Sequence, residues 1–267
     1  MNMPLKKLRT SVKKIPGMRR LYRGAKKFSL RATKPLLDHL LKLHGVTYNM
    51  WDVISTKNCE FMRDPEFMKG FQAANKQEYH LNYGGWVAYI NQWASHHAKR
   101  LKGDFVECGV HKARFAMSNM IYINFKTLVD RRYYLFDTFC GLAKDFCSQE
   151  ELSTYKGIYS EDTYEFVKNS FKDFSNVVIV RGPVPTTLAA VKIDQVAYLS
   201  IDMNCVLPEL EALKYFWPKM VKAGIVILDD YAQIGHEKQK KALDDFATSE
   251  GVKILSLPTG QGMIIKS

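Results

Sequence analysis

The chain has 267 residues, which is long enough for one large α/β domain with appendages. Hydrophobic residues make up 46% of it and charged residues 25%, so a wholly disordered chain is excluded. The net charge of +12 lies in residues 1–45, which hold thirteen Lys and Arg and one acid, whereas the remaining residues carry equal numbers of bases and acids.

Residues 1–45 form a basic arm in which apolar residues recur at helical intervals from Leu5 to Phe28, with a break at Pro16-Gly17. This pattern predicts an N-terminal helical extension whose basic face contacts an anionic membrane or a partner. A helical appendage with its basic face in solvent, RNA binding and a transit peptide stay open as alternatives. Nucleic acid is disfavoured because the rest of the chain adds no basic patch with interleaved aromatics.

The sequence lacks an apolar run of about 18 residues and the apolar core of a secretory signal. The five cysteines are an odd number without a CxxC pair or zinc spacing, which favours a reducing compartment. We therefore expect a cytoplasmic protein that is soluble or peripheral at the membrane.

Residues 46–100 show helical spacing punctuated by Pro65 and Gly84-Gly85, and we expect them to form a helical cap near the substrate cleft. Residues 101–267 then alternate between strand and helix patterns. The predicted strands are 104–109, 133–137, 177–181, 196–202, 224–229, 252–257 and 263–266; the predicted helices are 113–125, 163–171, 186–191, 207–221 and 236–249. This order predicts an α/β fold, a doubly wound Rossmann-like sheet whose last strand is antiparallel.

The first predicted strand of this sheet leads into a turn at Gly109, whose missing side chain lets a ligand approach the backbone. The next strand ends at Asp137, where a carboxylate can accept hydrogen bonds from ribose hydroxyls. Either feature alone is also explained by an ordinary turn, but together they favour a nucleoside cofactor. The lack of GxGxxG argues against a dinucleotide, and S-adenosylmethionine, which has no phosphate, needs less glycine.

Two later strands end in acid, at Asp202 and at Asp229-Asp230. The carboxyl ends of parallel strands meet at one edge of a sheet, and carboxylates crowded there repel each other unless a cation neutralises them. Each Asp could instead cap the helix that follows its strand. The pair facing a third acid favours a site for a hard divalent cation, which takes oxygen ligands.

From about Gly103 to the C-terminus the motifs resemble those of the macrocin and mycinamicin O-methyltransferase family. The resemblance rests on 103–110, 136–142, Arg181-Gly182 with Thr187-Leu188, 200–202, and 224–231. It implies a class I S-adenosylmethionine-dependent methyltransferase that binds magnesium and methylates sugar hydroxyls of natural products and glycans.

The resemblance also implies roles for individual residues. Asp202, Asp229 and Asp230 should hold the metal. Glu107, Gly109 and Asp137 should line the cofactor site. Beyond what the resemblance implies, we expect Val110, His111, Thr138, Phe139 and Gly182 to bind the cofactor beside them. The chain departs from the family at three places. In the turn after Gly109, residues 111–114 read His-Lys-Ala-Arg where the family has an aromatic, a basic residue and two glycines. Pro183-Val184 stands in place of an aromatic pair, and Asn204 stands in place of an acid.

A sugar hydroxyl is too weak an acid to react at neutral pH, and coordination of vicinal hydroxyls to Mg²⁺ would lower its pKa and orient it. Asp202, His111 and His236 are the candidates for the proton acceptor, although a histidine at a helix end can also be solvent-facing or capping. The stretch 138–176, with Tyr155 and Tyr159, is a candidate lid or a simply packed helix.

Two other functions stay open: O-methylation of a catechol-like or other vicinal diol, and a methyltransferase fold without turnover that binds a membrane or RNA. The sequence does not name the acceptor, and it leaves a homo-oligomer open.

Overall fold

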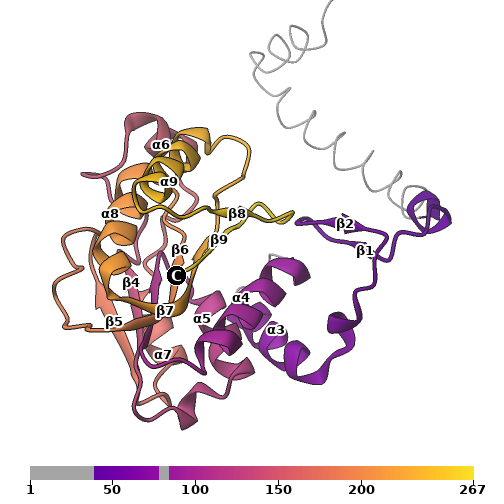
Figure 1. Cartoon of the computed structure of the whole chain (residues 1–267), viewed down its shortest axis with the longest axis horizontal. Coiled ribbons are helices and arrows are strands. Elements are labelled where there is room, and N and C mark those ends of the chain that lie inside the picture. The colour runs from indigo at the N-terminus through magenta and orange to yellow at the C-terminus, as the bar shows by residue number, and fades with distance from the viewer. Residues whose placement is uncertain (1–38, 78–83) are drawn as a thin grey trace, which may run out of the picture. The chain divides into compact units, whose positions relative to one another are not determined.

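The computed structural model describes residues 39–77 and 84–267 and divides into two units (Figure 1). In the first unit, residues 39–43 are helical and β1 (Tyr48–Asn49) pairs antiparallel with β2 (Ile54–Ser55). The second unit holds residues 50–53 and everything from Glu60 onward. Most of the predicted basic arm, residues 1–38, lies outside the described residues, so its helical extension stays a sequence prediction.

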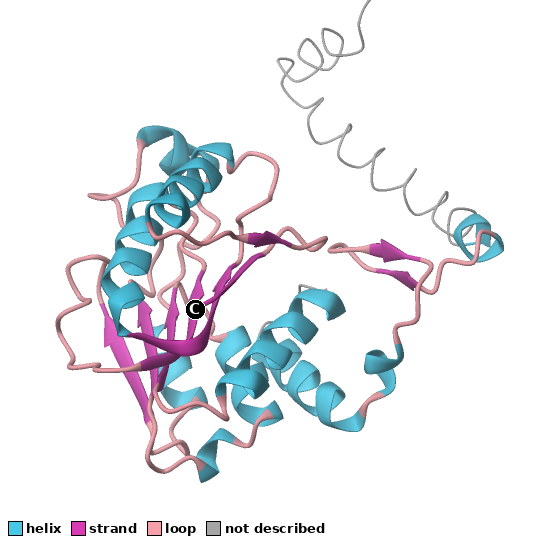
Figure 2. Ribbon diagram, viewed as in Figure 1, coloured by secondary structure: helices cyan, strands magenta, loops and turns pink. Residues whose placement is uncertain are grey.

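The second unit is built on a seven-stranded sheet with the order β5-β4-β3-β6-β7-β9-β8 (Figure 2). Neighbouring strands from β5 to β7 are parallel, whereas β9 is antiparallel to both β7 and β8. The strands are β3 (Asp104–Cys108), β4 (Tyr133–Asp137), β5 (Val177–Arg181), β6 (Val196–Ile201), β7 (Met220–Leu228), β8 (Leu255–Ser256) and β9 (Gly262–Ile265). The predicted doubly wound sheet with an antiparallel last strand is confirmed.

Helices cover both faces of the sheet because the side chains of its buried strands alternate between two apolar cores. Val106 and Cys108 of β3 face the core completed by α8 (Val206–Phe216) and α9 (Glu237–Ser249). Phe105 faces the opposite core, which is completed by α4, α5 and α7. These helices are α4 (Gly85–Ala98), α5 (Arg114–Tyr122) and α7 (Tyr164–Ser170), and α3 (Pro65–Gln77) packs against α5. The 3-10 helices are Glu60–Arg63, Phe125–Thr127 and Trp217–Lys219.

Several predicted elements differ in the structure. Residues 186–191 form turns and a bend and not the predicted helix. An unpredicted helix, α6 (Gln149–Thr154), begins at a capping box in which Ser148 and Glu151 exchange side-chain to backbone hydrogen bonds. The strand predicted at 252–257 shortens to β8.

The cysteines do not behave as the sequence analysis predicted for a reducing compartment. Cys147 and Cys205 form a disulfide, and Cys59, Cys108 and Cys140 are free thiols. Because the two bonded cysteines are 58 positions apart in sequence, the pairing depends on the tertiary fold and gives no local sequence signal.

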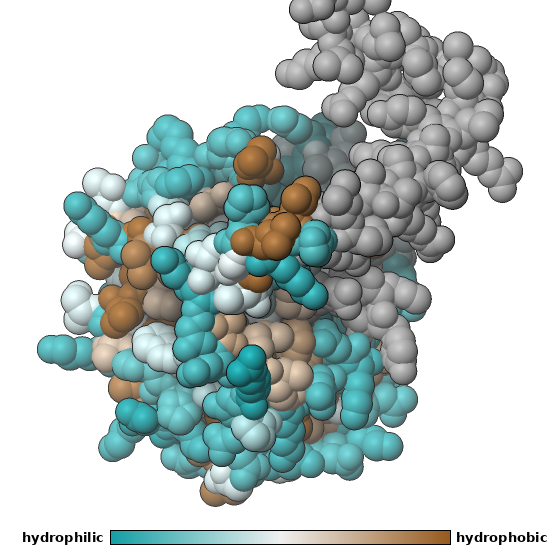
Figure 3. Space-filling model, turned by 90° about the vertical axis from the view of Figure 1, so that its right-hand side faces the viewer, coloured by the Kyte–Doolittle hydropathy of each residue, from teal (hydrophilic) through white to brown (hydrophobic). Residues whose placement is uncertain are grey.

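In residues 39–77 and 84–267, every helix is too short or too polar to cross a membrane. The face of the molecule drawn in Figure 3 is largely hydrophilic, with apolar residues in small separate groups.

Candidate active site

A cavity opens at the carboxyl ends of β3, β4, β5 and β6, where the sheet order reverses direction. It brings together seven of the predicted cofactor-binding residues, and it also reaches Asp202. The seven are Gly109, Val110, His111, Asp137, Thr138, Phe139 and Gly182. Glu107, Asp229, Asp230 and His236 do not line this cavity.

Gly109 has a steric reason to be glycine. Its φ is 85°, in the left-handed region, and a Cβ on it would lie 1.8 Å from the carbonyl oxygen of Asp202. No side chain fits at that distance. The glycine therefore lets the turn after β3 lie directly against the end of β6, which places the cofactor turn beside the first predicted metal ligand.

Asp137 organises the turn that follows Gly109. Its Oδ2 accepts the N–H groups of Val110 and His111, and its Oδ1 accepts the N–H of Phe139 at 2.6 Å. The turn needs this support because His111 and Ala113 both have positive φ, 47° and 56°, without being glycine. The predicted ribose ligand is thus also the residue that holds the strained turn.

Glu107 lies inside the core and not in the cavity. Its side chain is 1% exposed, and its Oε2 accepts a hydrogen bond from the hydroxyl of Tyr133 at 3.2 Å. Burial raises the pKa of Glu107 to about 8. Strand alternation explains the placement, since Cys108 and Glu107 must point to opposite faces of the sheet.

The three predicted metal ligands form a partly buried, mutually repelling group. Burial and the neighbouring acids raise the pKa of Asp202 well above its usual range and that of Asp229 to about 7, and burial also raises the pKa of Asp230. Neutral amides contact two of them: Asn204 donates to Asp202 at 3.2 Å and Gln261 donates to Asp229 at 3.0 Å.

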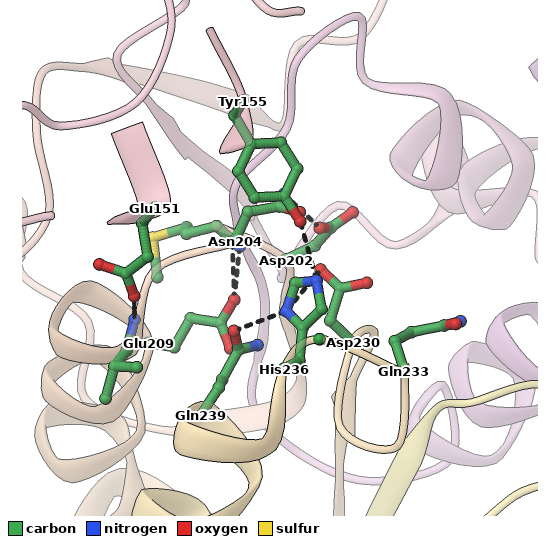
Figure 4. Close-up of polar contacts among 12 residues, drawn as sticks. Glu151, Tyr155, Asp202, Asn204, Glu209, Asp230, Gln233, His236 and Gln239 are labelled. Atoms are coloured by element: carbon green, nitrogen blue, oxygen red, sulfur yellow. Dashed lines mark hydrogen bonds and ion pairs between the residues drawn. The ribbon is translucent and has the colours of Figure 1, made fainter. Parts of the chain in front are cut away.

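Asp230, which lies beside His236 in Figure 4, differs from the other two acids. Its Oδ2 is buried and has no hydrogen-bond partner among the described residues, and Nδ1 of His236 lies 4.0 Å away from it. A buried oxygen without a partner is costly, and a cation could satisfy it. Even so, no group of three or more His, Cys, Asp or Glu in the described parts of the chain is already arranged around a metal position.

His236, one of the predicted proton acceptors, belongs to a hydrogen-bond chain that runs back toward β6 (Figure 4). Its Nε2 lies 2.8 Å from the hydroxyl of Tyr155, and its Nδ1 lies 3.0 Å from Oε1 of Gln239. Nε2 of Gln239 donates to Oε2 of Glu209. An ionised Glu209 can only accept, so Gln239 donates to it through Nε2 and presents Oε1 to His236. Nδ1 is then the protonated nitrogen of His236, and Nε2 accepts from the hydroxyl of Tyr155.

Glu209 closes the chain and was not predicted from the sequence. It is fully buried, and its Oε1 accepts the N–H groups of Met203 at 2.8 Å and Asn204 at 2.9 Å. Burial, with the charge of Asp230, raises the pKa of Glu209 to about 8. The sequence held one signal for this role: Glu209 is the single acid on the otherwise apolar face of α8, the helix that follows β6.

His111 occupies a different part of the site. Its ring lies edge-on to Tyr159 with 5.1 Å between ring centres, and its carbonyl accepts the hydroxyl of Thr163. Both predicted histidines thus contact tyrosines of the stretch predicted as a lid.

The strand order, with its antiparallel last strands and the cavity at the carboxyl edge, is that of the class I methyltransferase fold. A family profile described as macrocin O-methyltransferase (TylF) matches residues 91–255. The chain belongs to this family and is an S-adenosylmethionine-dependent O-methyltransferase. The family predicted from the sequence motifs is confirmed.

Solved structures agree with the fold. The O-methyltransferase NovP is 18% identical, with a TM-score of 0.62 over 74% of this chain and 88% of that chain. The calicheamicin methyltransferase CalS11 is 15% identical, with a TM-score of 0.55 over 79% and 98%. A putative caffeoyl-CoA O-methyltransferase from Staphylococcus aureus is 10% identical, with a TM-score of 0.51 over 78% and 95%. A search of curated proteins gave no match.

Proposed function

We propose that this enzyme transfers the methyl group of S-adenosylmethionine to a sugar hydroxyl of a glycan, glycolipid or glycosylated natural product, with Mg²⁺ held by Asp202, Asp229 and Asp230. One observation carries the proposal: Asp202 lines the cavity and also belongs to the group of repelling acids. A methyl donor in the cavity and an acceptor near the acids would therefore meet at Asp202.

The cofactor side of the proposal rests on the turn at Gly109 and on Asp137. Oδ2 of Asp137 already accepts two backbone N–H groups, which fill its two lone-pair sites. Oδ1 accepts one backbone N–H, so a ribose hydroxyl would donate to Oδ1 in place of the hydroxyl of Thr138, which lies 3.3 Å from it. We assign Gly109, Val110, His111, Thr138, Phe139 and Gly182 to the remaining cofactor contacts because they line the same cavity.

The acids suit Mg²⁺ by their chemistry, since all three offer hard oxygen ligands and Oδ2 of Asp230 lacks a hydrogen-bond partner among the described residues. When bound, the ion would supply Lewis-acid activation of the acceptor hydroxyl and would offset the repulsion between the carboxylates.

The chain's own groups then bind, orient and deprotonate. Asp202 is the proton acceptor that lines the cavity, and Nε2 of His236 is a second acceptor whose proton relay would pass through the hydroxyl of Tyr155. Tyr159 covers the cavity beside His111 and would help to exclude water from the reacting atoms.

The acceptor class is the least constrained part of the proposal. It is supported by the description of the family, which names macrocin, and by the calicheamicin methyltransferase among the structural neighbours. Peripheral membrane contact of a cytoplasmic enzyme through residues 1–45 is supported by their charge alone.

The test is a titration with S-adenosylmethionine, with and without Mg²⁺, followed by a screen of glycans with labelled cofactor. We expect the double variant Asp229→Asn with Asp230→Asn to keep the fold and cofactor binding but to lose methyl transfer. Asp245→Asn, on the exposed side of α9, is the control for the loss of a surface charge. Activity that does not depend on Mg²⁺, or full turnover by the double variant, would refute the metal assignment.

A further inference from the structure

One segment at the carboxyl edge of the sheet keeps its position without a buried side chain. We call residues 141–160, which include α6, the strap. None of these residues is buried. A segment that contributes nothing to the core gains little from the hydrophobic effect, which anchors the neighbouring helices. The position of the strap therefore depends on a few individual links.

The covalent link is the disulfide between Cys147 of the strap and Cys205. Cys205 is fully buried, immediately precedes α8 and lies three residues after Asp202. The disulfide thus ties a segment without core contacts to a fixed point of the active site.

Two hydrogen bonds join the strap to the same side of the molecule (Figure 4). Oε1 of Glu151 accepts the N–H of Val206, the first residue of α8, at 2.8 Å. The hydroxyl of Tyr155 lies 2.8 Å from Nε2 of His236. A further ion pair, Glu150 with Lys238, joins side chains that are 73% and 80% exposed, so it contributes little.

The strap also forms one wall of the cavity. Gly141, Leu142, Ala143, Cys147 and Tyr159 line it, together with the turn at Gly109 and Asp137. A displacement of the strap would therefore open the cavity to solvent, and the link that restrains the strap most strongly has one of its sulfurs in the cavity wall.

We propose that Cys147 and Cys205 form a thiol–disulfide switch: the disulfide latches the strap over the cavity, and its reduction frees the strap and speeds the exchange of cofactor. The part that concerns cofactor exchange rests on the proposed assignment of this cavity to S-adenosylmethionine. The agents are a low-molecular-weight thiol and its disulfide, such as the reduced and oxidised forms of glutathione.

Reduction of the Cys147–Cys205 disulfide takes two thiol–disulfide exchange steps. The thiolate of the small thiol attacks Sγ of Cys147, which is partly exposed, and the S–S electron pair leaves on Sγ of Cys205, which takes up a proton. A second small thiol attacks the outer sulfur of the mixed disulfide and releases Cys147 as a thiol. Two small thiols are oxidised to one disulfide, and the protein disulfide is reduced; the oxidised agent drives the reverse reaction.

The first experiment follows the strap itself in the full-length protein. Alkylation and mass spectrometry should find three free thiols after treatment with oxidised glutathione and five after reduction. Trypsin should cut at Lys144 and Lys156 of the strap on the order of tenfold faster in the reduced protein, because the closed position has lost its covalent restraint. Cys147→Ser should be cut fast in both states, and Cys140→Ser, which removes the exposed cysteine of the same loop, should respond like the wild type.

The second experiment measures the dissociation of S-adenosylhomocysteine in both redox states by stopped flow. We expect faster release from the reduced wild type and from Cys147→Ser. Equal proteolysis and equal release in the two states, or failure of oxidised glutathione to pair Cys147 with Cys205, would overturn the switch. Another outcome is that S-adenosylhomocysteine fails to bind in either state while proteolysis still depends on the redox state. In that case the cofactor assignment is wrong, and the disulfide controls the strap but not cofactor exchange.

Discussion

Gly109 and Asp202 lie in backbone contact at the ends of β3 and β6, so close that a Cβ on Gly109 would meet the Asp202 carbonyl oxygen at 1.8 Å. The contact joins the cofactor turn to the acidic group. It also means that the two halves of the proposed site cannot move apart or together without a change in the sheet itself.

We therefore expect Gly109→Ala to lower the free energy of unfolding by about 2 kcal/mol or more and to weaken cofactor binding. Gly157→Ala is the matched control, because Gly157 also has a positive φ, 78°, but a Cβ added to it would meet no atom within 4 Å. Urea unfolding and S-adenosylhomocysteine titration would measure both effects. A Gly109→Ala protein no less stable than the Gly157→Ala protein would contradict the steric argument.

Asp137→Asn should loosen the turn after β3. An asparagine presents one amide nitrogen where the carboxylate accepted N–H groups, so at least one of the backbone donors at Val110, His111 and Phe139 loses its acceptor. Hydrogen bonds to a charged group contribute about 1.5–3 kcal/mol each, and we expect a cofactor affinity lower by roughly tenfold or more. Calorimetric titration with S-adenosylhomocysteine checks this, with Asp145→Asn on the exposed part of the strap as control. Unchanged affinity would show that the turn holds its shape without Asp137.

These two positions show how far the sequence could predict the site. The ends of the strands are local features, so Gly109, Asp137 and the three acids could be placed at one edge of the sheet before the structure. The direction of a side chain and the pairing of distant segments are not local. For this reason Glu107 was placed in the cavity although it points into the core, and neither the Cys147–Cys205 disulfide nor the buried Glu209 was predicted.

The placement of Glu107 has a consequence for stability. An ordinary Glu pKa is 4.5, and burial raises that of Glu107 to about 8 in the folded state. The folded protein therefore holds this proton more tightly than the unfolded chain, so the contribution of Glu107 to stability is fully present below about pH 4.5 and is lost as the pH rises toward 8. The loss amounts to a few kcal/mol, at about 1.4 kcal/mol for each pH unit of the shift.

Glu107→Gln removes the titration and keeps an acceptor for the hydroxyl of Tyr133. Urea unfolding at intervals between pH 5 and 9 should show the wild type losing stability relative to this variant as the pH rises. A difference between the two proteins that stays constant over this range would rule out a raised pKa at Glu107.

Glu209 determines which groups donate and which accept in the hydrogen-bond chain from Glu209 through Gln239 to His236. In Glu209→Gln the new amide can face the amide nitrogen of Gln239, and relief of this donor–donor contact requires Gln239 to turn its NH₂ toward His236. The proton of His236 would then move from Nδ1 to Nε2, and Nε2 could no longer accept from Tyr155. We expect methyl transfer to fall by on the order of tenfold, while the stability changes by about 1–3 kcal/mol.

The double variant Glu209→Gln with Gln239→Glu restores the original order, because residue 239 again accepts from Nδ1 of His236 and now also accepts from residue 209. Nitrogen-15 NMR of the histidine ring at pH 9, above the raised pKa of Glu209, identifies the protonated nitrogen. We expect protonated Nδ1 in the wild type and in the double variant, and protonated Nε2 in Glu209→Gln. The same tautomer in all three proteins would mean that Glu209 fixes the loop at Met203 and Asn204 but has no influence on the proton of His236.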